Sequence, residues 1–297
     1  MHGPRLNPQK VNRPMSVLRI AVLILAGLAL TAQEPVGLAG KGGNFFSLEK
    51  DAALGRQLAA EFRKRTTPID KPTVQNYLDR LGKRLAAHVP DATFPFTFSA
   101  IAEDLCPTIH EPAALPGGYV FVPAALFIAA QDEAEFAGML AHAMEHIAQR
   151  RVTRQATQSQ LVSHASTPLI FIGGWGGGCS EEQSIPLAFV TQQRSYEMEA
   201  DFLAVQVMAR AGLDPKALVR YIQRVQVRRA RTVSKAYSPV PDRDHRVANM
   251  LWVIEKLQTV DYAAFAPDEF AAVQQKMRRL IPVNSHTPPS LMRKTPE

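Results

Sequence analysis

Apolar side chains recur every three to four residues along most of the chain, and this spacing predicts a mainly helical protein. Val74, Leu78, Leu81 and Leu85 follow it within residues 72–88, where they would line one face of a helix. The same pattern predicts further helices over residues 44–65, 124–130, 132–155, 195–212, 215–231, 243–258 and 267–279.

Two short segments show a different pattern and predict strands. Residues 94–101 alternate apolar and polar side chains, and residues 119–122 are rich in β-branched and aromatic ones. Pro116–Gly118 predicts a turn just before the second strand. A small sheet would then precede the helix at 132–155, so the predicted fold class is α+β and mainly helical.

A glycine-rich stretch at residues 167–190 interrupts the helical pattern. No Gly-Lys-Ser/Thr follows its glycines, so it is not a phosphate-binding loop. We expect a loop here that joins two long helices and that acts as a lid over whatever site those helices carry.

The N-terminus predicts export. Arg13 and Arg19 precede an apolar run at residues 20–32, which is shorter than the roughly 20 residues that a membrane-spanning helix needs. This is typical of a signal peptide that is cleaved near Ala32, and an uncleaved anchor is the alternative. The mature protein would be periplasmic or otherwise in the cell envelope. The expected organisation is a signal peptide at 1–32, a flexible lead at 33–43, one domain at 44–283 and a disordered tail at 284–297.

Charge and cysteine content exclude some classes of function. The formal net charge is +7, but the excess lies in the two tails, and residues 34–275 carry about −1. A near-neutral body argues against nucleic-acid binding, which needs a basic face on the folded part. The two cysteines, Cys106 and Cys179, are too few for a disulfide framework, and whether they pair stays open.

Candidate chemistry begins with His142 and His146, which lie one helical turn apart and can reach one metal ion together. Glu197, on a later helix, would complete a two-histidine, one-glutamate set with a fourth place left for water. Asp201 lies one turn beyond Glu197 and could orient a ligand histidine. The alternatives are histidines that serve packing and an acidic helix face that faces solvent.

Five stretches in order resemble metallopeptidase family 48, which includes the CAAX prenyl proteases, HtpX and periplasmic BepA-like enzymes. They cover about residues 44–252 and read NFFSLEKDAALGRQLAAE, ALPGGYVFVPAAL, EAEFAGMLAHAMEHIAQR, YEMEADFLAVQVMARAGLDP and SPVPDRDHRVANM. The resemblance implies a zincin-like fold, with the small sheet beside the histidine helix. It also implies that His142, His146 and Glu197 bind one zinc ion and that Asp201 supports a ligand.

The resemblance further implies a substrate class. An extended polypeptide would add to a strand edge at the border of the cleft. The residues implied at this edge are Ala114, Leu115, Pro116, Gly117 and Gly118. Unfolded or misassembled polypeptides are the expected partners, while the oligomeric state and a peripheral association with the membrane stay open.

Three residues depart from the family pattern. Ala143 stands where the family's HExxH motif has its glutamate, which takes a proton from the attacking water and passes it to the leaving amine. Ser238 stands where the family has a histidine that helps at the metal or the developing oxyanion. Glu111 replaces the usual asparagine before the ALPGG stretch, which we expect to alter contacts with the substrate.

Glu145 is the one candidate to replace the lost base. On a helix it lies as far to one side of the histidine pair as Ala143 lies to the other. In this helix direction it should point away from the substrate, and pairing with Arg150 or exposure to solvent are the alternatives. The sequence therefore supports two functions, a zinc endopeptidase of the cell envelope and a pseudopeptidase with a chaperone or binding role. A scaffold without metal is a third, weaker hypothesis.

Overall fold

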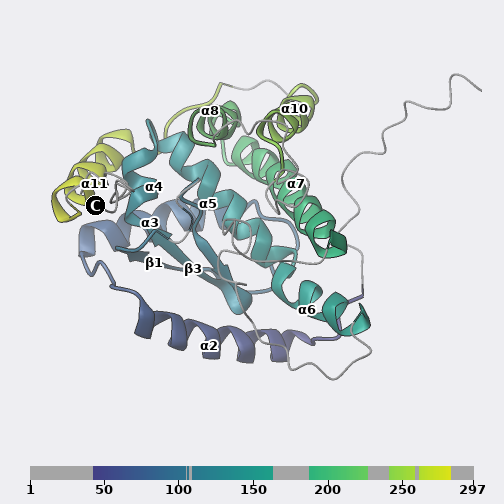
Figure 1. The fold of residues 1–297 in the computed structure, drawn as a ribbon. Helices are drawn as coiled ribbons and strands as arrows, with labels where there is room; N and C mark the ends of the chain where they lie inside the picture. The colour runs from purple at the N-terminus through teal and green to yellow at the C-terminus, as the bar shows by residue number, and fades with distance from the viewer. Residues whose placement is uncertain are drawn as a thin grey trace, which may run out of the picture. The chain divides into compact units, whose positions relative to one another are not determined.

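The computed structural model describes residues 43–104, 106, 109–162, 187–226, 241–257 and 261–281. Helices dominate these residues, and three short strands form one sheet, which confirms the α+β class (Figure 1). The helices are α2 (Leu48–Arg65), α3 (Pro72–Ala86), α4 (Ala124–Ala129), α5 (Glu133–Ala148), α6 (Arg151–Val162), α7 (Leu187–Arg210), α8 (Lys216–Val225), α10 (Arg243–Ile254) and α11 (Pro267–Leu280).

The sheet has the strand order β1-β3-β2. β1 (Thr97–Ile101) pairs in parallel with β3 (Tyr119–Pro123), and β2 (Ala113–Leu115) pairs antiparallel with β3. The one-turn helix η2 (Pro116–Gly118) makes the predicted turn between β2 and β3. Within the described residues the sheet ends at β2, which is therefore an edge strand.

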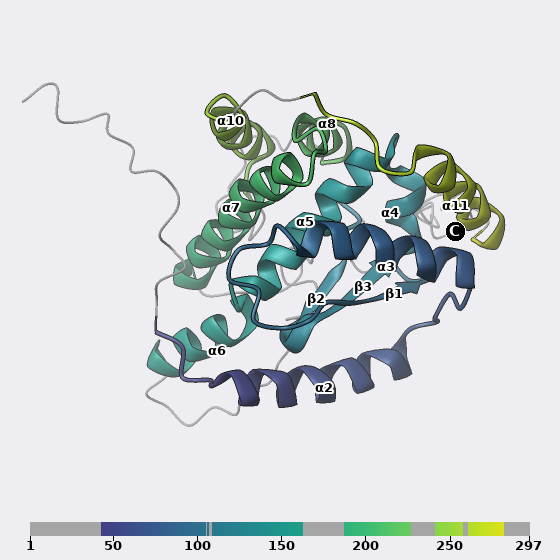
Figure 2. The same cartoon turned by 180° about the vertical axis from the view of Figure 1, so that it is seen from behind.

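The helix α5 is the centre of the fold. Every residue from Glu135 to Ala148 is buried, because α3, α7, α8 and the strands pack around the helix. Figures 1 and 2 both place α5 between the sheet and α7. A helix buried on all sides must satisfy its polar side chains internally, and those on α5 are the histidines and glutamates of the candidate site.

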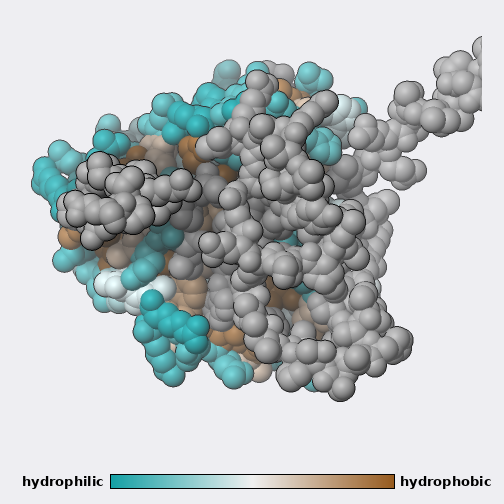
Figure 3. All heavy atoms as spheres, viewed as in Figure 1, coloured by the Kyte–Doolittle hydropathy of each residue, from teal (hydrophilic) through white to brown (hydrophobic). Residues whose placement is uncertain are grey.

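The helix α2 begins at a side-chain cap and lies against η2. The Ser47 hydroxyl accepts a hydrogen bond from the Lys50 backbone N–H at 3.3 Å. At Gly55 the backbones come so close that an added Cβ would lie 1.8 Å from the Pro116 carbonyl oxygen. This contact requires glycine and places α2 next to the predicted substrate edge. Figure 3 shows hydrophilic side chains over much of the visible surface of the described helices.

Three predicted boundaries are wrong. The single helix expected over 132–155 is two helices, because Arg150 adopts a left-handed conformation (φ 53°) between α5 and α6. The loop expected to extend to residue 190 ends earlier, since α7 already begins at Leu187. The helix expected over 215–231 ends at Val225.

Several predictions fall on residues that the structure does not describe. These are the signal peptide at 1–32, the flexible lead up to residue 42, the loop at 163–186, Cys179, Ser238 and the tail at 284–297. Cys106 is disulfide-bonded. Among the described helices, none is both long and apolar enough to cross a membrane.

Candidate metal centre

The two histidines of α5 lie together in the interior. His142 is fully buried, His146 is 6% exposed, and their Nε2 atoms lie 3.1 Å apart. The spacing of one helical turn brings both rings to the same face of α5, as expected.

The helix α7 brings a carboxylate to this face. Glu197 is buried, with Oε2 at 3.4 Å from His142 Nε2 and Oε1 at 3.7 Å from His146 Nε2. The long packing contact between α5 and α7 holds the three side chains together.

A fourth donor comes from the segment before β2. Oε1 of Glu111 lies 3.4 Å from His146 Nε2 and 3.7 Å from His142 Nε2. The carboxylate of Glu111 lies among the candidate metal-binding groups, and its effect on substrate contacts stays a prediction. Glu111, His142, His146 and Glu197 each offer one ligand atom, and these atoms all lie within 4.8 Å of one another.

These distances fit a metal ion. Four atoms placed tetrahedrally at about 2.0–2.1 Å from zinc lie about 3.3–3.4 Å from one another. The two imidazole nitrogens lie 3.1 Å apart, and carboxylate oxygens of Glu111 and Glu197 lie 3.4–3.7 Å from them, with a different oxygen of Glu197 facing each imidazole. Two imidazoles and carboxylates are also the donor types of zinc sites in proteins. The donor set therefore fits a divalent cation, and the ligand role of each residue stays a prediction.

A buried ion pair lies on the Nδ1 side of the His142 ring, opposite the donor set. Oδ1 of Asp201 lies 3.0 Å from His142 Nδ1. The Arg246 guanidinium donates to both oxygens of Asp201, at 2.6 and 2.7 Å, and to Gln226 Oε1 at 3.2 Å. Asp201 and Arg246 are both fully buried. The network leaves Nε2 of His142 turned toward the donor set, which is the role expected of Asp201.

The sequence contained a signal for Arg246 that the motif analysis missed. Arg246 shares the buried stripe of α10 with Met250 and Val253, at positions i, i+4 and i+7. A charged residue in phase with a buried stripe needs a buried partner of opposite charge. That partner is Asp201, on a different helix.

Arg151 is a second residue that sequence analysis missed. Its Nη1 lies 2.6 Å from Glu197 Oε1 and 2.9 Å from His146 Nε2. The left-handed residue Arg150 ends α5 and makes Arg151 the first residue of α6. No glycine or proline marks this break, so the sequence pattern ran through it.

The electrostatic surroundings act differently on the two histidines and on Glu197. Burial, reinforced by Arg151, lowers the pKa of His146 to about 4, so this imidazole is neutral at pH 7. Burial alone would raise the pKa of Glu197, but Arg151 and the two imidazoles hold it well below its usual value. For His142, burial is outweighed by hydrogen bonds to Asp201 and Glu197, which raise its pKa to about 9.

The residues on the two flanks of the histidine pair are both buried. Ala143 is fully buried and has no titratable group. Glu145 is also fully buried, which excludes the exposed alternative, and Arg150 pairs with Asp51 instead. Burial raises the pKa of Glu145 to about 8, and the nearby Glu199 adds to this effect. Glu145 is not part of the four-residue donor group, and its role as a replacement base stays a prediction.

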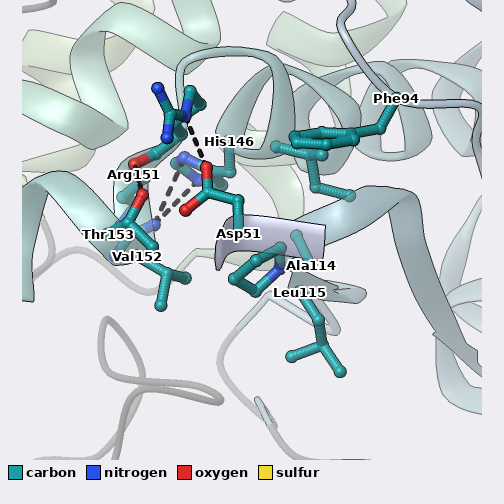
Figure 4. Close-up of a pocket in the computed structure, with 11 residues that line it drawn as sticks. Asp51, Phe94, Ala114, Leu115, His146, Arg151, Val152 and Thr153 are labelled. Carbon is teal, nitrogen blue, oxygen red and sulfur yellow. Dashed lines mark hydrogen bonds and ion pairs between the residues drawn. The ribbon is translucent and has the colours of Figure 1, made fainter. Parts of the chain in front are cut away.

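A small pocket connects the site with the predicted substrate edge. Ala114, Leu115 and Pro116 line it on one side, and His146 and Arg151 line it on the other (Figure 4). Gly117 and Gly118 follow in η2 with positive φ angles of 78° and 99°. The edge of β2 and the histidine helix therefore border the same space, as the substrate model requires.

Comparison with known proteins supports the resemblance. The model of "Peptidase family M48" matches residues 72–253, more than half of the chain. The chain belongs to this family. The match begins with α3 and extends through most of α10, so it includes all four residues of the donor group.

Curated relatives carry one name. The "Beta-barrel assembly-enhancing protease" of Yersinia pestis is 27% identical over 219 residues, which cover 67% of this chain and 43% of the relative. The protein of the same name from Escherichia coli (strain K12) is 27% identical over 200 residues, which cover 62% of this chain and 39% of the relative. The chain thus matches about two fifths of the length of these relatives.

Proposed function

We propose that this M48 chain binds a zinc ion and unfolded or misassembled polypeptides of the cell envelope, and that it has largely lost peptide hydrolysis. One observation carries the proposal. The metal-binding donors are assembled and supported from behind, while Ala143 stands where the family has its glutamate base. A missing general base lowers a rate by roughly 10²–10⁴-fold.

The metal part of the proposal rests on His142, His146 and Glu197, which would hold the ion. Asp201 would keep the His142 ring in place, with Nε2 free for the metal. A bound zinc ion would polarise a peptide carbonyl and make water more acidic. Without a carboxylate at residue 143, this chain has no group there to take the proton from water and deliver it to the leaving amine.

The polypeptide part rests on β2. As one of the two edge strands of the described sheet, β2 can accept an extended segment as a further strand. The pocket between Leu115 and His146 would then lie beside the added segment. Such binding uses backbone groups, so it suits unfolded chains of varied sequence.

The location in the cell envelope has two supports. One is the basic, apolar and small-residue pattern of residues 1–32, which is typical of an export signal. The other is the name of the relatives, which links them to β-barrel assembly. Misassembled envelope proteins are the substrate class that follows from both.

A second candidate function is metal-dependent endopeptidase activity. It is favoured by the retained set of His142, His146 and Glu197 and by the relatives' name as proteases. It requires a base other than residue 143.

The deciding experiment uses the purified full chain with zinc and a fluorescently labelled, chemically unfolded protein. Fluorescence anisotropy measures binding, and gel electrophoresis over hours measures cleavage, each with and without a chelator. We expect binding without chelator-sensitive cleavage. A His142→Ala variant purified in the same way controls for contaminating proteases. Cleavage that the chelator and this variant both abolish would establish the endopeptidase instead, and absence of binding would refute the polypeptide part.

A further inference from the structure

We propose that Glu111 is a fourth protein ligand of the metal ion and that it closes the site by filling the place that a hydrolase leaves to water. This inference rests on the metal part of the proposed function. The family resemblance implies three ligands and an asparagine at this position, so the fourth ligand is a property of this chain's own sequence.

Glu111 and Glu197 both approach the two imidazoles. Oε1 of Glu111 lies 3.4 Å from one histidine Nε2 and 3.7 Å from the other, while Glu197 reaches them with different oxygens, Oε2 at 3.4 Å and Oε1 at 3.7 Å. A carboxylate that only accepted a proton from a metal-held water would stand one atom farther from the ion than the ligands do. Glu111 instead offers one oxygen at 3.4 and 3.7 Å from the two imidazoles, and the ligand atoms of all four residues lie within 4.8 Å of one another, close enough to hold one ion together.

The segment that carries Glu111 is held on both sides. Before it, the Ile109 carbonyl oxygen accepts a hydrogen bond from the buried Tyr221 hydroxyl at 2.9 Å. The ring of His110 pairs with Asp104 at 2.6 Å. After it, Ala113 pairs with Phe121 in the sheet. The carboxylate therefore sits on a fixed backbone, as a ligand should.

Charge supports the same assignment. The side chain of Glu111 is 12% exposed and that of Glu197 is 1% exposed. Arg151 already lies 2.6 Å from Glu197, and a divalent cation would supply positive charge to both carboxylates, which have little access to water. A divalent cation bound by two carboxylates and two neutral imidazoles forms a neutral centre. The anionic fourth ligand would also make the ion a weaker Lewis acid than a site with two imidazoles and one carboxylate.

Two departures from the family pattern, Ala143 and Glu111, then both affect the attack of water on the peptide bond. Ala143 removes the group that takes a proton from water, and Glu111 removes the place where that water would bind. They lie on α5 and before β2, in different parts of the fold. Zinc sites with four protein ligands are typically structural, while catalytic sites keep one place open.

The first test measures metal affinity. The full chain is stripped with a chelator and titrated with Co²⁺ against a chromophoric chelator of known affinity. Glu111→Asn, which introduces the family's residue, should raise the Kd for Co²⁺ at least about tenfold, since even residues behind a ligand change affinity by about 10–100-fold. Glu111→Asp keeps the charge but shortens the reach, and its Kd should also rise. Exposed Glu61, changed to Gln, is the matched control and should leave the Kd unchanged.

The second test asks whether a coordination place is open. Azide is added to the Co²⁺-loaded proteins, and the visible absorption spectrum is recorded. The wild-type spectrum should not change, whereas the Glu111→Asn spectrum should shift because azide enters the vacated place. Circular dichroism of each variant verifies that the fold is intact.

Each alternative outcome has one meaning. If Glu111→Asn binds Co²⁺ as tightly as wild type, or if azide shifts the wild-type spectrum, the fourth-ligand proposal is wrong while the metal centre stands. If Glu111→Asp retains wild-type affinity, Glu111 acts through charge and not by ligation, which also overturns the proposal. If wild type binds no Co²⁺ at all, the proposed function fails as well. Loss of residual cleavage in Glu111→Gln at unchanged affinity would make Glu111 the base.

Discussion

The helix α5 carries two kinds of position, the candidate metal-binding histidines and the residues that flank them, and the two kinds differ in their surroundings. His142 and His146 meet two carboxylates and a buried arginine network, and the four candidate ligand atoms lie close enough to hold one ion. Their neighbours Ala143 and Glu145 flank the same pair; Ala143 has no titratable group, and Glu145 lies outside the four-residue donor group. Metal binding depends on groups from three elements that support one another, whereas proton transfer depends on one side chain. One substitution can therefore remove catalysis and leave the metal centre in place.

The largest expected effect is the recovery of peptide hydrolysis in a double variant. Ala143→Glu combined with Glu111→Asn supplies a base and opens a coordination place. We expect chelator-sensitive cleavage of an unfolded protein to rise by roughly 10²–10⁴-fold over wild type, measured by gel or by a fluorescent peptide. Ala143→Gln with Glu111→Asn is the matched control, because it has the same size without the base. Equal rates in both double variants would show that the site lacks more than these two groups.

The next effect concerns the network behind the histidines. Arg246→Met leaves Asp201 buried without its two-point partner. The free energy of unfolding should fall by about 3–5 kcal/mol, measured by urea denaturation. Arg243→Met, on the same helix but partly exposed, should change it by less than about 1 kcal/mol. A similar small change in both variants would contradict the view that this buried pair anchors α10 to α7.

A smaller effect tests whether Asp201 orients the ring of His142 for metal binding. Asp201→Asn keeps the size but weakens the acceptor for the ring of His142. Metal affinity should fall by about 10–100-fold, measured by chelator competition on the folded variant. Asp214→Asn, which changes a surface ion pair, is the control and should not alter affinity. If Asp201→Asn binds metal normally, Asp201 serves Arg246 alone.

The smallest expected effect concerns the ionisation of Glu145, on the side of the histidine pair opposite Ala143. The pKa of Glu145 is raised to about 8 in the folded protein, from about 4.5 when exposed. Between these values the folded state holds a proton that the unfolded state has released, so stability falls as pH rises from about 4.5 to 8. Glu145→Gln removes this dependence. In the chelator-treated protein the variant should match wild type within about 1 kcal/mol near pH 5 and exceed it increasingly toward pH 8.5. Parallel stability curves in thermal unfolding would show that Glu145 is ionised when folded.

Most helices could be predicted from the sequence because their signals are local. The apolar stripe of α3, the one-turn spacing of His142 and His146, and the turn at η2 need only a few neighbouring residues to be recognised. The break at Arg150 carried no such signal. It arises where Arg150 reaches Asp51 and the Phe46 carbonyl of the N-terminal segment, which is a tertiary contact.

The sequence by itself determined the family, the helical class, the histidine pair and the missing glutamate at residue 143, because each is written in a short segment with a fixed spacing. Only the tertiary structure decided that Glu111, Arg151 and Arg246 belong to the same site. These residues come from the segment before β2, from the start of α6 and from α10, and no periodicity links such distant segments. They meet because the packing of α5 against the sheet and α7 brings their elements to one buried place, where each charge needs a partner.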